Sequence, residues 1–205
     1  MLMSIAAKKL NYVFLIALIL GCAAFLVACK SSGGGNILGP SDETSDAAAI
    51  VIDANKDLRS IKILYEKNED KREELKKAMS EDNAAVLKKT ADEVVYIIND
   101  GVGLGTSALE KIEKARDMNV NPDYAEYLRL KADALQKQME AFEQYRQAAI
   151  KLRNNYDPKN KQEHDAVKAD FKQRSDKFRE IMEKARDSSN QANELAKEVL
   201  KKPQE

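Results

Sequence analysis

The feature that most constrains this chain is an apolar repeat with alternating steps of three and four residues, sustained between residues 47 and 199. In one stretch the repeat comprises Leu87, Ala91, Val94, Ile98, Gly101, Gly105, Ala108, Ile112 and Ala115. This spacing places side chains on one stripe of an α-helix, whereas a half-buried strand alternates apolar and polar residues. A stripe kept in heptad phase is typical of long helices that pack side by side. We therefore expect long amphipathic helices throughout this part of the chain.

Turn and cap residues divide the repeat into four segments. A polar turn is expected at residues 80–83. Asn121-Pro122 and Asp157-Pro158 each combine a good N-cap with proline at the first helical position, so each pair predicts a helix start. Short connections make chain neighbours antiparallel. The prediction is an all-α, up-down-up-down antiparallel four-helix bundle with long helices, over residues 47–203 and preceded by a flexible tether.

The N-terminal segment has a different character. Lys8 and Lys9 are followed by an uncharged, nearly continuous apolar run from Leu10 to Ala28. The run ends in Leu26-Val27-Ala28-Cys29, and a Gly- and Ser-rich stretch follows. This order of basic start, apolar run, small residue and cysteine resembles a bacterial lipoprotein signal, which signal peptidase II cuts before the cysteine.

The resemblance implies a signal peptide at residues 1–28, a diacylglyceryl group on Cys29 and a tether over residues 29–46. The body is then expected in the cell envelope, outside the cytoplasmic membrane, either periplasmic or surface-exposed. Lys30 stands where an Asp would retain such a protein at the inner membrane, which favours the outer membrane if the source has one. Two alternatives stay open: a weaker lipobox ending at Cys22, and an uncleaved anchor helix.

Composition excludes several classes of function. Basic and acidic residues are equal in number, at 34 each, so the chain lacks the positive charge typical of nucleic-acid binding. One His and two Cys are too few for the usual zinc or haem ligand sets. His164 has Lys161 three residues earlier instead of the Glu of a di-iron bundle. We therefore expect His164 to cap a helix or to lie at the edge of the apolar stripe. With no nucleophile elbow, phosphate loop or zinc-protease motif, we expect no enzyme activity, metal or cofactor.

Three glycines interrupt the second helical segment and suggest a candidate site. Gly101, Gly103 and Gly105 follow a β-branched run, but a dinucleotide-binding loop needs a different glycine spacing and a parallel sheet. Each glycine inside a helix costs about 1 kcal/mol relative to alanine. A kink or a close contact with a neighbouring helix is therefore expected, and one kinked helix is favoured over two short ones.

Arg174 interrupts the apolar repeat of the last segment. If the helices are antiparallel, Arg174 lies level with Glu140 and with the three glycines. This predicts a mid-bundle pocket for a small anionic ligand, lined by Gly101, Gly103, Gly105 and Arg174, with Asp100, Glu140 or Asp57 as charge partners. The alternative is an arginine whose stem packs while its head reaches an acidic partner or water.

These features together predict a membrane-anchored, exported lipoprotein whose bundle is a non-catalytic interaction or structural module in the cell envelope. Its expected partners are the membrane, through the lipid, and an envelope protein or a second copy of the chain, but not nucleic acid. Residues 81–83 and 154–157 form the end of the bundle farthest from the tether, and the expected contact surface is this end or an exposed edge of the apolar stripe. The alternative function is a ligand-binding bundle with its pocket at Gly101–Gly105 and Arg174.

Overall fold

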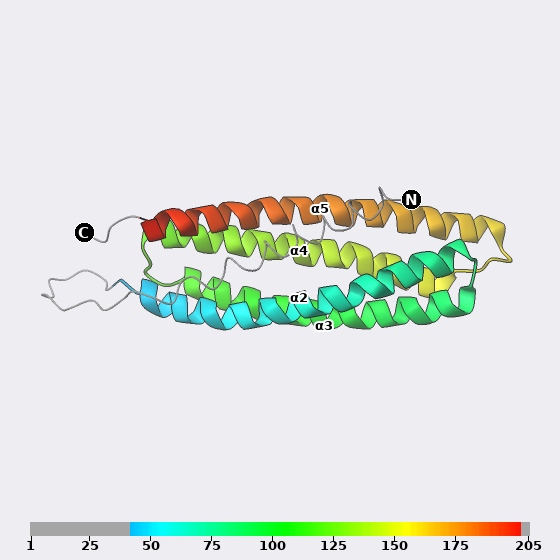
Figure 1. Cartoon of the computed structure of the whole chain (residues 1–205), viewed down its shortest axis with the longest axis horizontal. Helices are drawn as coiled ribbons and strands as arrows, with labels where there is room; N and C mark the ends of the chain where they lie inside the picture. Colours follow the sequence, from blue (N-terminus) through cyan, green and yellow to red (C-terminus); the bar gives the residue numbers. More distant parts are fainter. Residues whose placement is uncertain (1–41, 202–205) are drawn as a thin grey trace, which may run out of the picture.

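The computed structural model describes residues 42–201, which form four α-helices (Figure 1). The helices are α2 (Thr44–Ser80), α3 (Ala84–Arg116), α4 (Pro122–Asn155) and α5 (Lys161–Lys201). Because the described residues contain helices and no strand, the predicted all-α class is confirmed. The signal-like segment and Cys29 lie outside the described residues. The first helix starts at Thr44, so the last three residues assigned to the tether are helical.

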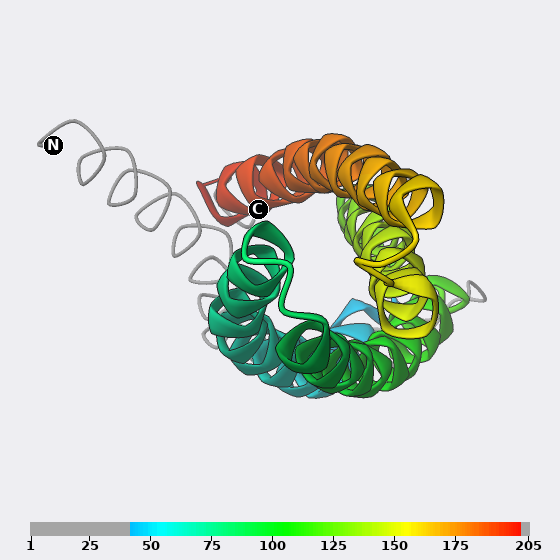
Figure 2. The same cartoon turned by 90° about the vertical axis from the view of Figure 1, so that its right-hand side faces the viewer.

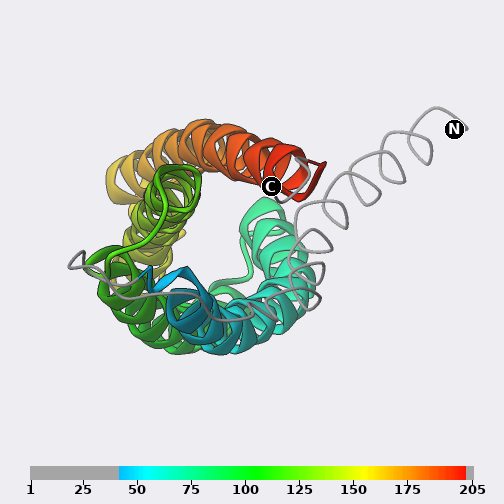
Figure 3. The same ribbon diagram turned by 90° about the vertical axis from the view of Figure 1, so that its left-hand side faces the viewer.

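Chain neighbours pack against each other along the bundle. The helix pairs that pack closely are α2 with α3, α3 with α4, and α4 with α5. Viewed along the bundle, the helices follow an arc in chain order (Figures 2 and 3). The α2 and α5 helices stand at the two ends of that arc. Among the described residues, they approach each other only at isolated points. We call this line between α2 and α5 the seam.

The apolar repeat forms the core, as its spacing predicts. Every member of the repeat in α3, from Leu87 to Ala115, is buried. The α4 helix lies between α3 and α5, so it buries a wider face that includes Tyr127, Lys131 and Tyr145. The core divides into one cluster near the turn at residues 80–83 and another near the opposite end of the bundle. We call these two ends the tip and the base.

Cap residues start two of the helices where the sequence predicts. The side chain of Asn83 accepts a hydrogen bond from the backbone amide of Val86 at 3.2 Å. Asn121 accepts one from the amide of Tyr124 at 2.9 Å, with Pro122 at the first helical position. Each bond satisfies an amide that has no partner within its own helix.

The start of α5 differs from the prediction, which was wrong by three residues. This helix begins at Lys161, not at Pro158. Asp157 Oδ1 accepts a hydrogen bond from the backbone amide two residues later, at 2.9 Å, and so stabilises a turn instead of a helix. Asn160 takes the capping role, since its Oδ1 accepts from the amide three residues on at 3.3 Å.

The glycine stretch lies within one helix. The α3 helix runs without interruption from Ala84 to Arg116, as expected for one helix in place of two short ones. Gly101 and Gly105 are buried, whereas Gly103 is exposed. A methyl group built on Gly105 would lie 3.0 Å from Met139 Cγ of α4, so this glycine allows α3 and α4 to approach closely.

Candidate functional site

An apolar pocket lies in the seam, with α4 as its floor. Its walls include Leu58 and Tyr65 of α2, Leu135 and Phe142 of α4, and Met182 and Ala192 of α5. The cavity has a volume of about 120 Å³ and is partly open to solvent. We call it the seam pocket. It exists because α2 and α5 do not pack together along this line, so apolar side chains from three helices face a shared space.

Two lysines are among the residues that line the seam pocket. Lys131 of α4 is only 9% exposed, and its Nζ lies 5.7 Å from the centre of the Tyr127 ring. Lys62 of α2 lies at the pocket as well, with its Nζ 3.8 Å from the carboxylate of Glu66. The described residues that line the pocket include no Asp or Glu. A lysine this deeply buried is uncommon, so the pocket combines an apolar lining with two lysine side chains, each of which interacts with another group of the protein.

On the tip side of the pocket, Arg72 bridges the seam. Its guanidinium carbon lies 4.5 Å from the centre of the Tyr65 ring on its own helix and 5.8 Å from that of Phe178 on α5. Cation–π contacts of this kind contribute about 1 kcal/mol. Arg72 therefore joins α2 to α5 where helix packing does not.

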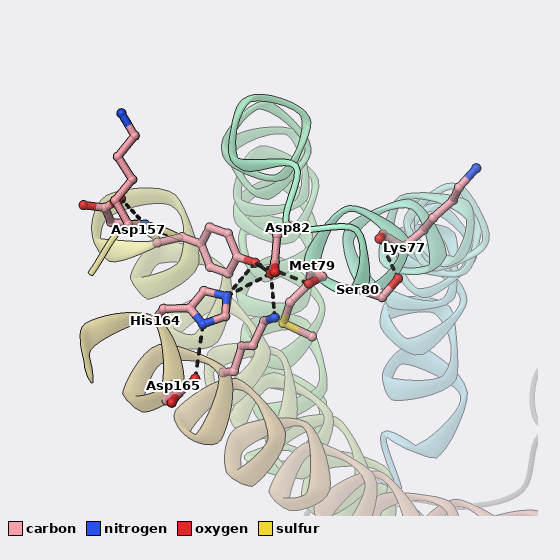
Figure 4. Close-up of polar contacts among 10 residues, drawn as sticks. Lys77, Met79, Ser80, Asp82, Asp157, His164 and Asp165 are labelled. Atoms are coloured by element: carbon pink, nitrogen blue, oxygen red, sulfur yellow. Dashed lines mark hydrogen bonds and ion pairs between the residues drawn. The ribbon is translucent and has the colours of Figure 1, made fainter. Parts of the chain in front are cut away.

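A second polar group closes the tip of the bundle (Figure 4). It consists of Asp82, Tyr156, His164 and Lys168, which we call the tip cluster. Asp82 Oδ1 accepts hydrogen bonds from the Tyr156 hydroxyl and the Lys168 ammonium, both at 2.7 Å. His164 Nε2 lies 2.9 Å from the same oxygen. Asp82 has a φ of 50°, a left-handed conformation that aspartate tolerates, and it joins the α2–α3 turn to the α4–α5 turn.

The pKa values of two groups in the tip cluster, Asp82 and Tyr156, are shifted away from neutrality. Hydrogen bonds from Lys168, Tyr156 and His164 hold the pKa of the Asp82 carboxyl well below its usual range. Burial and the bond to Asp82 raise the pKa of the Tyr156 hydroxyl well above its usual range. A general acid or base works best with a pKa near the operating pH. The pKa values of Asp82 and Tyr156 are both shifted away from neutrality, so neither of these two groups is tuned to exchange a proton at neutral pH, and their hydrogen bond joins two turns of the bundle.

At the base, hydrogen bonds tie the start of α2 to the α3–α4 connection. The backbone amide of Glu43 donates to the carbonyl of Asn119, and the amide of Asn119 donates to the Glu43 carboxylate, both at 2.8 Å. The amide of Asn121 donates to the Thr44 hydroxyl at 3.0 Å. The turns that join helices at the base and at the tip are therefore each fixed to a distant part of the chain.

The glycines and Arg174 are not brought together. Arg174 Nε donates to Asp170 at 3.1 Å, and its Nη1 donates to Gln144 of α4 at 3.3 Å. Cavities lined by Gly101 or Gly103 lie between α2 and α3 and do not include Arg174. The packing order explains the separation, since close packing joins α5 to α4 and not to α3. The charge partner of Arg174 is thus Asp170 on its own helix, and not one of the three carboxylates that were expected.

The cavity at Gly101 is small. It has a volume of about 20 Å³ and is lined also by Asn68, Ile98 and Phe142. The buried Oδ1 atom of Asn68 has no hydrogen-bond partner among the described residues. A cavity of this size holds about one water molecule, which is much less than a small-molecule ligand requires.

The other predicted charge partners lie elsewhere. Asp57 accepts hydrogen bonds from Ser107 at 2.9 Å and from Lys111 at 2.8 Å, so it links α2 to α3. Asp100 and Glu140 are exposed.

Neither the seam pocket nor the tip cluster was predicted from the sequence. The burial of Lys131 could have been predicted, because this residue stands three residues after Leu128 and four before Leu135 and so occupies a position of the apolar repeat. His164 and Lys168 are four residues apart and therefore share one face of a helix. Their partner Asp82 lies in another turn, and nothing local in the sequence connects it to them.

Within residues 42–201, no group of three or more His, Cys, Asp or Glu side chains converges as a metal site would require. The helices of that same stretch include none with an apolar run sufficient to cross a bilayer. Comparison with protein-family models, with curated proteins and with solved structures gave no match.

Proposed function

We propose that this chain is an exported lipoprotein, anchored through Cys29, whose bundle is a non-catalytic binding module of the cell envelope. The observation that carries the proposal is the seam pocket, an apolar cavity of about 120 Å³ that three helices line. Clefts between the helices of a bundle are common sites for apolar ligands. The cavity approaches the volume of about 150 Å³ at which an engineered apolar cavity binds benzene.

The tip cluster supports the non-catalytic part of the proposal. Of the polar groups described, it comes nearest to an acid–base arrangement, because one carboxylate, one phenol and one imidazole converge within hydrogen-bond distance. The pKa of Asp82 is lowered and that of Tyr156 is raised, so neither group exchanges a proton near neutral pH. Its function is to hold the two hairpins together at the tip.

The base end supports anchoring close to the membrane. The contacts of Glu43 and Thr44 hold the start of α2 at the base, directly after the segment that resembles a lipoprotein tether. Lys131 stands nine residues after the start of α4, which is about 14 Å along the helix. The seam pocket then opens in the half of the bundle nearer to the lipid anchor.

Anchoring is tested by metabolic labelling with an alkyne-bearing palmitate, followed by membrane fractionation of the full chain. The wild type and Cys22→Ala should carry the label and remain with the membrane. Cys29→Ala should lose the label. Equal labelling of the Cys29→Ala chain would overturn the proposed site of attachment.

Binding in the seam is tested with a neutral probe, a hexanol that carries a photoactivatable diazirine, applied to membranes that contain the full chain. Peptide mass spectrometry should locate the crosslink on residues that line the seam pocket. Ala192→Leu adds apolar volume to the pocket and should remove this crosslink, because Ala192 lines the cavity at 4% exposure. Ala85→Leu, at an exposed position of α3, is the matched control and should leave the crosslink unchanged. If no probe crosslinks in the seam, the binding function is wrong.

A further inference from the structure

The most exposed of the large apolar side chains lie on the hairpin that α2 and α3 form. Among the described residues they are Ile52 and Ile63 of α2 and Val86 and Tyr96 of α3, and none lies on α4 or α5. Tyr96 is 68% exposed and Ile63 is 54% exposed. Ile52 and Ile63 are separated by about three helical turns, so they lie on one side of α2. We call the surface marked by these four residues the hairpin face.

An ion pair fixes which residues of α2 and α3 are level. Lys71 of α2 pairs with Glu93 of α3 at 2.7 Å. Because the two helices are antiparallel, Tyr96, three residues after Glu93, lies level with the α2 residue three before Lys71. Val86, seven residues before Glu93, lies level with the α2 residue seven after Lys71. The hairpin face therefore extends along α2 from Ile52 to the level of residue 78.

A groove lies in the middle of the hairpin face. Its lining includes Ile63 and Leu64 of α2 and Asp100, Gly103 and Leu104 of α3, and its volume is about 600 Å³. Since Gly103 has no side chain, the backbone of α3 forms the floor of the groove at this point. Exposed apolar residues that gather around a groove are typical of contact sites for another protein.

Unpaired charges of opposite sign stand on the two helices near the groove. Arg59 and Lys67 of α2 and Asp100 and Glu110 of α3 are exposed. None of these four side chains has an ion-pair partner among the described residues. The unpaired charges near the groove are thus positive on α2 and negative on α3, so a complementary partner must present the same two charges in the reverse order.

We propose that the hairpin face binds a second copy of this chain, in a dimer whose two-fold axis is parallel to the helices. The inference goes beyond the proposed function and does not depend on the seam pocket. The two-fold rotation places α2 of each copy against α3 of the other at the same level. Asp100 is level with residue 64, so it lies within about 5 Å along the bundle of the level of Lys67 of the second copy. Ile63 of each copy fills the groove of the other, and every contact is made twice, as in an isologous interface.

Charge selects this arrangement over an antiparallel dimer. An axis across the helices would place α2 against α2, so that Arg59 and Lys67 of one copy would face the same positive side chains of the other. Like charges that meet across an interface lower its affinity. The parallel dimer also leaves the starts of both α2 helices at the base, as two copies anchored in one membrane require, and this point alone rests on the proposed anchoring.

The hairpin face is large enough for a stable dimer. From Ile52 to the level of residue 78, its length is about 39 Å at 1.5 Å per residue. Two helices side by side are about 20 Å wide, which gives a footprint of about 780 Å². Specific interfaces typically bury about 800 Å² on each partner.

The test places the photoreactive amino acid p-benzoylphenylalanine at position 96, in place of Tyr96, in the full chain. Irradiation should give a product of twice the chain mass, and mass spectrometry should locate the crosslink on α2 of the second copy, near residues 66–70. The same amino acid in place of Lys172, at an exposed position of α5, is the control and should give no such product. A crosslink to α3 of the second copy would overturn the parallel arrangement. Absence of the doubled product, or products with other proteins or lipid alone, would overturn self-association.

Exchange of charges tests the pairing of α2 with α3. Asp100→Lys places like charges opposite each other at two equivalent positions and should lower the yield of the doubled product about tenfold. The double variant that combines Asp100→Lys with Lys67→Asp restores opposite charges and should recover the yield. Ile63→Gln should also lower the yield, whereas Ala169→Gln, at an exposed position of α5, should leave it unchanged. If Asp100→Lys keeps the yield of the wild type, or if the double variant does not recover it, the proposed pairing is wrong.

Discussion

Replacement of single glycines in α3 by alanine should separate two effects of these residues. One is the low helix propensity of glycine, and the other is the space that a glycine leaves for a neighbouring helix. At Gly103 an added methyl group meets no atom within 4 Å beyond its immediate surroundings on the helix, so only the helix propensity changes. Alanine is favoured over glycine inside a helix by about 1 kcal/mol. Gly103→Ala should therefore raise the free energy of unfolding by about 1 kcal/mol. For a chain of this size that corresponds to an increase of about 2–4 °C in Tm.

At Gly105 the same gain in propensity is opposed by a clash. The added methyl group would lie 3.0 Å from Met139 Cγ and 3.1 Å from its Sδ, so the Met139 side chain must shift. Overpacking of a core usually costs about 1–3 kcal/mol, and the flexibility of methionine places this site at the lower end. The net effect of Gly105→Ala should lie between no change and a loss of about 2 kcal/mol.

Urea denaturation of the full chain, followed by helical circular dichroism, measures both values. Ala169→Gly, at an exposed position inside α5, is the control that reports the propensity term in this bundle. It should lower the free energy of unfolding by about 1 kcal/mol. A gain at Gly105→Ala equal to that at Gly103→Ala would refute the inferred contact with Met139. A loss at Gly103→Ala would show that its open face is occupied.

Three further predictions concern polar contacts. Tyr156→Phe should lower the free energy of unfolding by about 1.5 kcal/mol in urea denaturation, because it removes a 2.7 Å bond to a carboxylate, while the exposed Tyr96→Phe should change nothing. The folded-state pKa of Asp82 lies below its ordinary value of 3.8. The stability that the ionised Asp82 carboxylate contributes to the fold is therefore complete above that pH and is lost as the pH falls below it. The Tm of Asp82→Asn should therefore differ from that of the wild type at pH 6, and the two Tm values should converge in acid. A constant difference in Tm across that pH range would contradict the assignment. Arg174→Leu should change the free energy of unfolding by less than about 0.5 kcal/mol, because the side chain is 35% exposed and Asp170 keeps its ion pair with Lys151 at 3.1 Å; a gain of several kcal/mol would show a costly buried charge.

The sequence was sufficient to predict the helices, their order and most of the core. Apolar spacing depends only on helix geometry, which is why Leu87, Ile98 and Ile112 were correctly assigned to the buried face. Local cap chemistry was equally informative at Asn121. It failed at Asp157, whose side chain stabilises a turn just as readily as a helix start, and the two outcomes differ by only a few residues.

The candidate sites needed information that spacing does not contain. Counting residues gives the level of Arg174 along the bundle but not the helix it faces, which depends on the packing order around the arc. A heptad repeat likewise does not reveal that one pair of helices stays apart, and the seam pocket exists for that reason. The bond between Asp82 and Tyr156 joins residues 74 positions apart, so no local pattern could have revealed it.

The order of packing also bears on how the chain reaches its native state. Most contacts lie within single helices, and each helix packs closely on the helix next to it in sequence. Proteins rich in local contacts fold in microseconds to milliseconds. The bond between Asp82 and Tyr156 requires both hairpins to be present, so it belongs to the final step of assembly. Weakening this bond should leave the refolding rate nearly unchanged and should instead shorten the lifetime of the native molecule.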